Sequence, residues 1–359
     1  SEIITEEYMD LKKIREEIDL KDSLIVKLLN DRMELAILST KLKTKIEDGD
    51  RENQVIENIK LNARGLIDPE FCANLYKQIM TESKRLQSKN YSVIGFAGEH
   101  GAYAEHAARE WNDVLVPVPC LDASSVFEGV IDGVFEYGIV PVENTFGGVV
   151  DETNSLLIKS DVNVVGAVDL PFHHCLLTLP GTDYRDIRAV YSNQLPLTQC
   201  RNFIARNHLE PISYGNAPSA AKLFSEKRPK AAALIASKAS AELYNLEIIK
   251  ENIEDYNVCR TRFLIISKER NTEGGNKCSV QFSTEHKAGT LFKILESFAK
   301  EDINLTRIES VPEDSGSFVF FLDFVGSLDD AKIKSIIGKM NDLTGELRIL
   351  GCYNEKVVK

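Results

Sequence analysis

The chain has 359 residues, of which 43% are hydrophobic and 27% are charged, a composition typical of a water-soluble protein with two or three domains. Its formal net charge of -12, with no long basic stretch, argues against nucleic acid as a partner. No apolar run approaches the roughly 20 residues of a membrane-spanning helix. Residues 1–17 lack the apolar core of a signal peptide. We therefore expect a cytoplasmic protein that does not associate with membranes.

The seven cysteines are scattered and form no C-x-x-C pair, which favours reduced thiols over a disulfide framework or a zinc site. His173 and His174 are adjacent on a predicted strand, so their side chains point to opposite faces and do not readily share one ion. Gly95, Gly98 and Gly101 do not have the spacing of a dinucleotide-binding loop. The sequence therefore predicts no metal and no cofactor.

The first 88 residues are predicted to be entirely helical. Residues 5–45 contain neither glycine nor proline, and isoleucine and leucine recur among them at helical spacing. A helix of about 40 residues would be about 60 Å long, so it needs either later helices or a second chain to pack against. Asp48-Gly49-Asp50 interrupts the pattern, which resumes over residues 50–62. Asp68-Pro69 then supplies an N-cap and a first residue for another helix.

The pattern changes at residue 91. Short strand-like segments alternate with helical stretches through residues 91–268, which predicts an α/β domain. Gly274-Gly275 lies in a polar link that is typical of a domain boundary. Residues 277–356 have the order strand, helix, strand, strand, helix, strand, which predicts an α+β domain of the ferredoxin-like type.

Basic residues on the long N-terminal helix indicate more than one ligand site. Arg32 and Lys43 are eleven residues apart, so they face nearly the same way at about 16 Å along the helix axis. Arg15 precedes Arg32 by seventeen residues, which is about 25 Å. A small ligand cannot reach both ends, so these arginines would bind different copies of it in a dimer of long helices. The alternative is that the charges only form solvated helix faces.

The polar residues of this region taken together match a family pattern, and they are Arg15, Arg32, Lys43, Asp48, Arg51, Glu52, Ser83 and Gln87. Because of these eight residues and their spacing, residues 8–88 closely resemble the all-helical chorismate mutase family. The resemblance implies an intertwined dimer of long helices and conversion of chorismate to prephenate. That rearrangement needs no nucleophile and no general base. It needs groups that hold a dicarboxylate in its reactive shape and stabilise developing charge.

The resemblance also implies how the two carboxylates of the substrate are held. Arginine side chains offer paired donors that match carboxylate geometry. Arg32 and Arg51 would bind them within one chain, together with Arg15 of the partner subunit. The partner's contribution makes the site dependent on the dimer.

The remaining residues of the set are implied to contact the reacting part of the substrate. Lys43 and Gln87 would donate hydrogen bonds to the breaking ether oxygen. Glu52 would accept a hydrogen bond from the ring hydroxyl. Asp48 and Ser83 would provide supporting polar contacts.

The middle of the chain resembles prephenate dehydratase in several segments that keep the family's order and spacing, at residues 95–108, 138–148, 173–177, 191–203 and 261–263. The resemblance implies two α/β lobes with an active site in the cleft between them. The family's reaction removes a hydroxyl and a carboxylate from prephenate to give phenylpyruvate.

The implied dehydratase residues lie in three of these segments. Thr261 would donate a proton to the leaving hydroxyl, and Arg262 and Phe263 would orient it and anchor the substrate. The polar residues implied to line the cleft are Glu143, Asn144, Ser192 and Gln199.

Several positions depart from the dehydratase pattern, namely Asn193, Leu195, Asn216, Pro218 and Cys259. Two interpretations follow. In the first, the cleft works with altered contacts and the chain is a bifunctional mutase and dehydratase. In the second, the cleft is inactive or has another specificity, and it serves the mutase as a regulatory or docking module.

The C-terminal segment resembles an ACT domain of the phenylalanine-sensing type. The glycine turn is Gly289-Thr290-Leu291, and the second motif is Glu309-Ser310-Val311-Pro312. The resemblance implies that L-phenylalanine binds between two chains of a homodimer, or of a tetramer of dimers, and lowers activity. Val311 stands where the family has arginine, which leaves the identity of the effector open. The alternatives are a purely structural dimerisation module and a chain whose domains only bind ligands.

Overall fold

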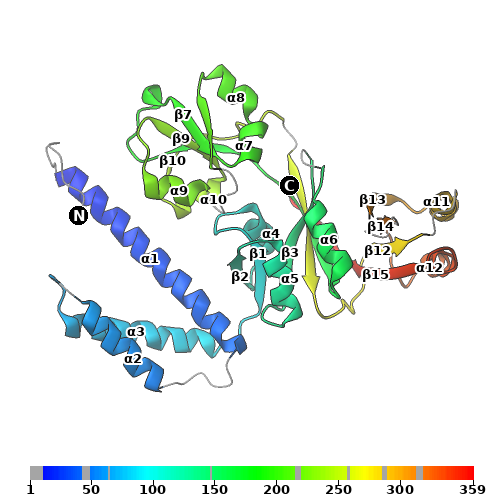
Figure 1. The fold of residues 1–359 in the computed structure, drawn as a ribbon, viewed down its shortest axis with the longest axis horizontal. Coiled ribbons are helices and arrows are strands. Elements are labelled where there is room, and N and C mark those ends of the chain that lie inside the picture. The colour runs from blue at the N-terminus through cyan, green and yellow to red at the C-terminus, as the bar shows by residue number, and fades with distance from the viewer. Residues whose placement is uncertain are drawn as a thin grey trace. The chain divides into compact units, whose positions relative to one another are not determined.

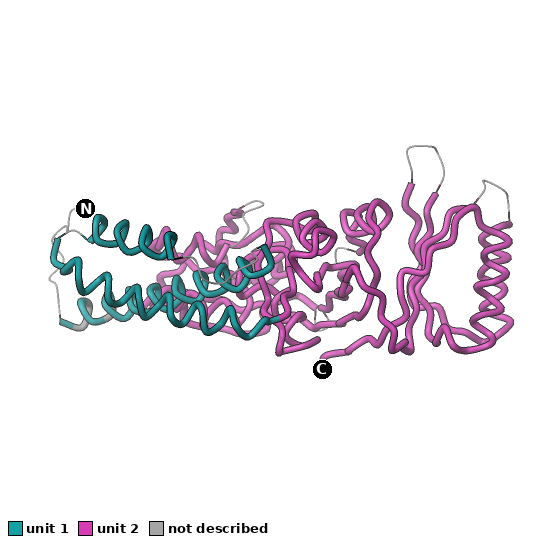
Figure 2. Tube along the Cα trace, turned by 90° about the horizontal axis from the view of Figure 1, so that it is seen from below, with its two compact units in different colours: residues 1–91 teal, residues 92–359 magenta. Residues whose placement is uncertain are grey.

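The structure is a computed structural model that describes residues 11–42, 49–63, 65–145, 148–214, 220–256, 259–284, 289–312 and 318–359. The side chains of residues 12, 13 and 16 are not among those described. The chain forms two compact units, residues 1–91 and residues 92–359, which are coloured separately in Figure 2. No helix in the described ranges combines the length and the apolar character that crossing a membrane would require.

The first unit is all helical (Figure 1). Its helices are α1 (Leu11–Leu42), α2 (Gly49–Asn62) and α3 (Pro69–Gln87). Asp68 caps α3, because its carboxylate accepts a hydrogen bond from the backbone N–H of Phe71 at 3.0 Å, and Pro69 takes the first helical position. These features confirm the helix start predicted from the sequence. Both α1 and α2 pack against α3.

Helix α1 buries little of its apolar surface within its own chain. Ile37 is its single buried residue among the side chains that the structure describes. By contrast, Ile25 is 55% exposed, Leu28 is 57% exposed and Leu35 is 66% exposed. Singly exposed apolar residues are common, but a series of them along one helix is typical of a surface that another element covers.

The second unit contains a mixed sheet around which its first lobe is built. In spatial order its strands are β16 (Glu355–Val357), β5 (Asn163–Pro171), β11 (Arg260–Ser267), β3 (Tyr137–Asn144), β1 (Val93–Ala97) and β2 (Val116–Cys120), and the short β4 (Gly148–Val149) pairs with β3. The middle strand β11 runs antiparallel to both of its neighbours, and β1 runs parallel to β2 and β3. Helices α4 (Tyr103–Trp111), α5 (Ala123–Ile131) and α6 (Asp151–Lys159) pack against this lobe.

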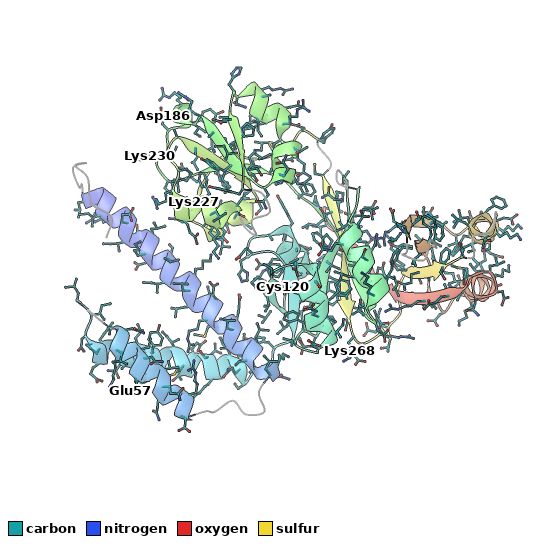
Figure 3. The ribbon with its side chains drawn as sticks, in the orientation of Figure 1. Glu57, Cys120, Asp186, Lys227, Lys230 and Lys268 are labelled. Atoms are coloured by element: carbon teal, nitrogen blue, oxygen red, sulfur yellow. The ribbon has the colours of Figure 1, made fainter. Side chains whose placement is uncertain are left out.

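The last long strand of the first lobe is tied to a helix at its end. Lys268, labelled in Figure 3 just beyond β11, donates from its Nζ to the carbonyl of Ile131 at the end of α5 at 3.1 Å. Ser267 of β11 likewise donates to the carbonyl of Glu136 at 3.0 Å. The position of β11 in the sheet is therefore fixed by side chains as well as by strand pairing.

A second mixed sheet forms the other lobe. Its strands in spatial order are β10 (Glu247–Lys250), β6 (Cys175–Thr178), β9 (Ala232–Ala236), β7 (Ala189–Ser192) and β8 (Glu210–Ser213). The helical segments of this lobe are η1 (Tyr184–Asp186), α7 (Gln194–Gln199), α8 (Arg201–Arg206), α9 (Ala220–Lys227) and α10 (Lys238–Leu243). The two lobes have separate apolar cores, one around Phe96 and Phe263 and others around Phe224 and Val190. The α/β lobes predicted from the sequence are confirmed.

The C-terminal part forms a four-stranded antiparallel sheet with two helices on one face. The strand order is β13 (Leu305–Pro312), β14 (Phe318–Val325), β12 (Lys277–Ser283) and β15 (Glu346–Tyr353), with helices α11 (Thr290–Lys300) and α12 (Ala331–Leu343). This is the ferredoxin-like order that the sequence predicts. After β15 the chain returns to the first lobe as β16, which the sequence analysis did not anticipate.

Candidate active sites

The first candidate site is a cavity of about 260 Å³ in the helical unit. Five residues of the predicted mutase set line it, namely Arg32, Arg51, Glu52, Ser83 and Gln87. They come from all three helices of this unit, and Ser83 and Gln87 share one face of α3 because they are four residues apart. The structure therefore brings together polar side chains that are up to 55 positions apart in the sequence, from Arg32 to Gln87.

Hydrogen bonds across the helices fix the side chains of this cavity. The guanidinium of Arg32 donates to the hydroxyl of Ser83 at 2.5 Å. The amide of Gln87 donates to the carbonyl of Ala36 at 2.8 Å and to the hydroxyl of Ser39 at 3.0 Å. The cavity thus has cationic and amide donors and a carboxylate, Glu52, among its lining residues.

Lys84 is a further charged residue of the cavity that the sequence analysis missed. Its ammonium lies 2.7 Å from the carboxylate of Glu52. It directly follows Ser83 in the last turns of α3, but nothing local indicates that it meets α2. Its position depends on how α2 and α3 pack.

Three members of the predicted mutase set are not placed in the cavity. Arg15 is exposed on α1 and does not line it. Lys43 and Asp48 lie outside the described residues. The separation of Arg15 from the cavity agrees with the helix geometry, which puts it about 25 Å from Arg32.

The second candidate site is built around Thr261 on β11. The side-chain amide of Asn144, at the end of the neighbouring β3, donates to the Thr261 hydroxyl at 2.8 Å. The two residues are paired in the strand register, and Thr261 is 9% exposed. Because the Thr261 oxygen accepts this bond, its hydroxyl hydrogen is left to donate in another direction.

A cavity of about 160 Å³ lies between the two lobes of the second unit. His100 and Tyr103 line it from the first lobe, and His174, Ser192 and Asn193 line it from the second. Ser192 was predicted to lie in this cleft, and its hydroxyl donates to the carbonyl of Ile235 at 2.6 Å. Tyr103 and His174 were not predicted as site residues, although both lie in segments of the dehydratase resemblance.

His174 is buried beside a predicted cleft residue. Its Nε2 lies 2.7 Å from the side-chain oxygen of Gln199, and the residue is 2% exposed. Burial lowers the pKa of His174, which favours the neutral ring at neutral pH. The ring of the adjacent His173 instead approaches Glu254 at 2.7 Å, and the same carboxylate accepts a hydrogen bond from the backbone N–H of His174 at 2.9 Å. The two imidazole rings therefore have different partners.

A glycine allows the lobes to approach each other at the start of α4. Gly101 has φ +86°, and a Cβ there would lie 3.3 Å from the Ser240 hydroxyl. Its carbonyl accepts a hydrogen bond from Ser237 of the second lobe at 2.8 Å. Its N–H donates to Glu105 at 2.8 Å. Burial opposes ionisation of Glu105, but hydrogen bonds from His100, Gly101 and Arg109 outweigh it and lower the pKa to about 2.

The structure places three of the predicted dehydratase residues away from the Thr261 hydroxyl. Neighbouring residues of a strand point to opposite faces, so Arg262 and its register partner Glu143 lie on the face opposite Thr261 and Asn144. Arg262 does not reach the cleft as expected, because its guanidinium binds Asp323 of the C-terminal sheet at 2.5 Å. Phe263 is 4% exposed in the core of the first lobe and is not available to a substrate.

The charge of Arg262 is stabilised where it lies. Burial opposes the charged form, but the carboxylates of Asp323 and Glu355 outweigh it and raise the pKa of Arg262 above its usual value. The same contact lowers the pKa of Asp323, where Arg262 and Arg307 outweigh the effect of burial. The pair is ionised at neutral pH.

The predicted effector residues fall at two places in the C-terminal sheet. Gly289 has φ +89° and precedes the first turn of α11, where Thr290 begins the helix and Leu291 packs against the core. Glu309 and Ser310 are neighbours on β13 and therefore point to opposite faces. Burial raises the pKa of Glu309, and the nearby carboxylate of Glu143 adds to this effect.

Comparison with known sequences divides the chain in the same way. The family chorismate mutase type II matches residues 14–88, and the family prephenate dehydratase matches residues 94–271. A bifunctional chorismate mutase/prephenate dehydratase from Aquifex aeolicus is 31% identical over 98% of this chain and 99% of its own length. The chain belongs to the bifunctional chorismate mutase/prephenate dehydratase family.

Solved structures resemble the second unit of this family member. A prephenate dehydratase from Arthrobacter aurescens in complex with L-Phe is 25% identical, with a TM-score of 0.65 over 73% of this chain and 89% of that one. A protein described as a novel type of quorum quenching acylase is 28% identical, with a TM-score of 0.68 over 73% of this chain and 97% of that one.

Proposed function

We propose that the chain converts chorismate to prephenate in its helical unit and prephenate to phenylpyruvate in its second unit, as two steps of phenylalanine biosynthesis. Membership of the bifunctional family supports both activities. The observation that carries the proposal is the cavity in which Arg32, Arg51 and Gln87 converge from three helices. Guanidinium and amide donors of this kind suit a small dicarboxylate.

For the mutase step, we assign Arg32 and Arg51 to the substrate carboxylates. Gln87 is assigned to donate to the ether oxygen as the carbon–oxygen bond breaks, exchanging its hydrogen bond to Ser39 for this one when the substrate binds. Lys43 is assigned the same role. Glu52 accepts a hydrogen bond from the ring hydroxyl. Ser83 holds Arg32 in place through their 2.5 Å hydrogen bond. The donors act because charge grows on the ether oxygen in the transition state and is stabilised there more than in the bound substrate.

For the dehydratase step, we assign Thr261 as the proton donor. Its proton goes to the ring hydroxyl, which leaves as water while the ring carboxylate leaves as carbon dioxide. The electron pair of the broken carbon–carbon bond completes the aromatic ring of phenylpyruvate. Asn144 orients Thr261 through the 2.8 Å hydrogen bond to its oxygen. Ser192 is assigned to the polar wall of the cleft, and Gln199 supports that wall through its contact with His174.

The mutase site is proposed to be completed by a second copy of the chain. Arg15 is exposed and does not line the cavity, although the family resemblance assigns it to the substrate. The exposed apolar residues of α1, such as Leu28 at 57% and Leu35 at 66%, supply a surface for the partner helix. A homodimer would bury this surface and would bring Arg15 of the partner subunit to the cavity.

The C-terminal part, residues 277–356, is proposed to be an ACT domain that binds L-phenylalanine. Its ferredoxin-like strand order and the left-handed Gly289 before α11 support this assignment. The similar dehydratase from Arthrobacter aurescens was solved in complex with L-Phe. Ser310, on the exposed edge strand β13, and the turn at Gly289 are the proposed contacts with the effector. Feedback inhibition then requires that phenylalanine bind two states of the protein with different affinities.

The three parts correspond to proposed domains at residues 1–88, 91–268 and 277–356. The alternative to a bifunctional enzyme is a mutase with an inactive or altered dehydratase-like cleft. Asn193 lines that cleft, whereas Asn216 and Pro218 lie outside the described residues. Phenylpyruvate formation from prephenate by the purified chain, followed by absorbance, separates the two. Turnover supports the proposal, and its absence in a protein that still rearranges chorismate favours the alternative.

A further inference from the structure

Two arginines flank Thr261 on β11, and both bind residues 355–358, which comprise β16 and the residue after it. Arg260 and Arg262 point to the face opposite Thr261, because residues alternate along a strand. Arg260 donates to the carbonyl of Val358 at 2.8 Å. Arg262 donates from its Nε to the carboxylate of Glu355 at 2.5 Å. The residues before and after Thr261 are therefore both held by residues 355–358.

The Arg262 contact is a buried network rather than a surface ion pair. Arg262 is 8% exposed, and its other two nitrogens bind Asp323 at 2.5 Å and the Tyr353 hydroxyl at 3.0 Å. The second oxygen of Glu355 is bound by Lys277 at 2.6 Å. Charge-assisted bonds in a buried site are short and directional, so this network fixes the direction of the Arg262 side chain.

Strand β16 also belongs to the sheet that carries Thr261. It pairs in parallel with β5, where Val357 is opposite Asp169, and the N–H of Val358 donates to the carbonyl of Asp169 at 2.9 Å. Asp169 is in turn opposite Arg262 in the β5–β11 register, and its carboxylate binds Arg260 at 2.9 Å. Backbone pairing and side-chain bonds thus connect β16 to the same stretch of β11.

We infer that Glu355 is a positioning residue for the dehydratase step, which sets the location of Thr261 through Arg262. The inference rests on the proposed function, in which Thr261 donates the proton. Glu355 does not touch the substrate in this account, since it lies on the face of β11 opposite the Thr261 hydroxyl. The chain beyond the ferredoxin-like sheet is therefore part of the framework of the dehydratase site.

The test replaces Glu355 by Gln in the full chain, which removes the charge and keeps the size. Displacing a catalytic group by about 1 Å costs up to about 100-fold in rate, so we expect kcat for prephenate to fall about 10- to 100-fold. KM should change by less than about twofold, because no substrate contact is lost. The matched control is Glu296→Gln, which breaks a surface pair with Lys300 (2.9 Å) in α11.

A second readout reports the position of Thr261 without relying on activity. The methyl group of Thr261 gives an NMR signal in protein labelled at threonine methyls, assigned by its loss in Thr261→Ser. We expect Glu355→Gln to shift this signal and Glu296→Gln to leave it in place. A purely structural role would lower the fraction of folded protein without moving the signal of the folded form.

The outcomes separate the inference from the proposed function. A lower kcat together with a shifted methyl signal supports the positioning role. An unchanged kcat, or a lower kcat with an unmoved methyl signal, overturns it. If wild-type protein forms no phenylpyruvate, the proposed function fails, and the methyl signal alone decides whether Glu355 positions Thr261. If Glu355→Gln does not fold, Tyr353→Phe removes the hydroxyl that binds Arg262 and Ser279 and is read in the same way.

Discussion

The side-chain amide of Asn144 donates a 2.8 Å hydrogen bond to the hydroxyl oxygen of Thr261, across 117 positions of sequence. The contact joins the end of β3 to β11, which are paired in the central sheet of the first lobe. It fixes which lone pair of the threonine oxygen is occupied, and so directs the hydroxyl hydrogen elsewhere. A proton donor needs this arrangement, because an unconstrained hydroxyl would spend most of its time in unproductive orientations.

We predict that Thr261→Val, which keeps the shape and removes the hydroxyl, lowers the dehydratase rate by about 100- to 10,000-fold. Thr261→Ser should retain most of the rate, because it keeps the donor. The measurement is phenylpyruvate formation from prephenate under saturating conditions. Chorismate rearrangement by the same preparations serves as the internal control. Equal rates for Thr261→Val and wild type would exclude Thr261 as the donor.

In the mutase site, Gln87→Ala should lower kcat for chorismate by about 100- to 1,000-fold, the usual loss for one donor at a developing oxyanion. Gln78→Ala is the matched control, since Gln78 is an exposed residue of the same helix. Prephenate turnover should be unchanged in both variants. A Gln87→Ala protein that rearranges chorismate at the wild-type rate would contradict the assignment.

The exposed apolar face of α1 is expected to be the dimer surface. Leu28 is 57% exposed in the single chain, so Leu28→Glu would bury a charge in the dimer and should yield monomers in sedimentation experiments. The monomer should also lose mutase activity, because Arg15 of the partner subunit would no longer be present. Lys21→Gln, at an exposed position of the same helix, makes the same change of one unit in net charge and is the control. If the wild-type protein sediments as a monomer and has full mutase activity, the dimer surface on α1 is ruled out.

Burial of His174 should make the second unit less stable in mild acid. Its pKa is lowered in the folded protein, so below the ordinary value of about 6.5 the unfolded chain binds a proton that the folded chain does not. The free energy of unfolding should therefore fall as the pH drops from 7.5 to about 5.5. Fluorescence of Trp111, the single tryptophan, reports unfolding of this unit.

His174→Gln should remove this part of the pH dependence, because glutamine does not titrate. The exposed His106 on α4 provides the control variant His106→Gln. If His174→Gln and wild type lose the same stability between the two pH values, the buried neutral histidine is not the cause.

Much of the fold follows from local sequence signals. Asp68-Pro69 marks the start of α3, and the alternation of strands and helices predicted for residues 91–268 is found in the two lobes. The order of elements after residue 277 predicts the ferredoxin-like sheet. These signals work because capping, chain stiffness and apolar periodicity act over a few residues.

Other features depend on contacts between distant segments. Strand β16 has three residues and no apolar alternation, and its partner β5 lies nearly 190 positions earlier, at Ala167 opposite Glu355. Lys84 meets Glu52 only because of how two helices pack. The position of Arg262 is a different case, because strand alternation alone places its side chain on the face of β11 opposite that of Thr261. The resemblance at residues 261–263 implied one shared site for these neighbours, although their side chains point to opposite faces.

The central claim is that one chain carries out both reactions, and a single time course tests it. The purified chain is given chorismate alone, and chorismate, prephenate and phenylpyruvate are measured together. We predict that chorismate disappears, prephenate rises and falls, and phenylpyruvate accumulates to the amount of chorismate consumed. Chorismate that remains unchanged, or prephenate that accumulates without phenylpyruvate, would contradict the account.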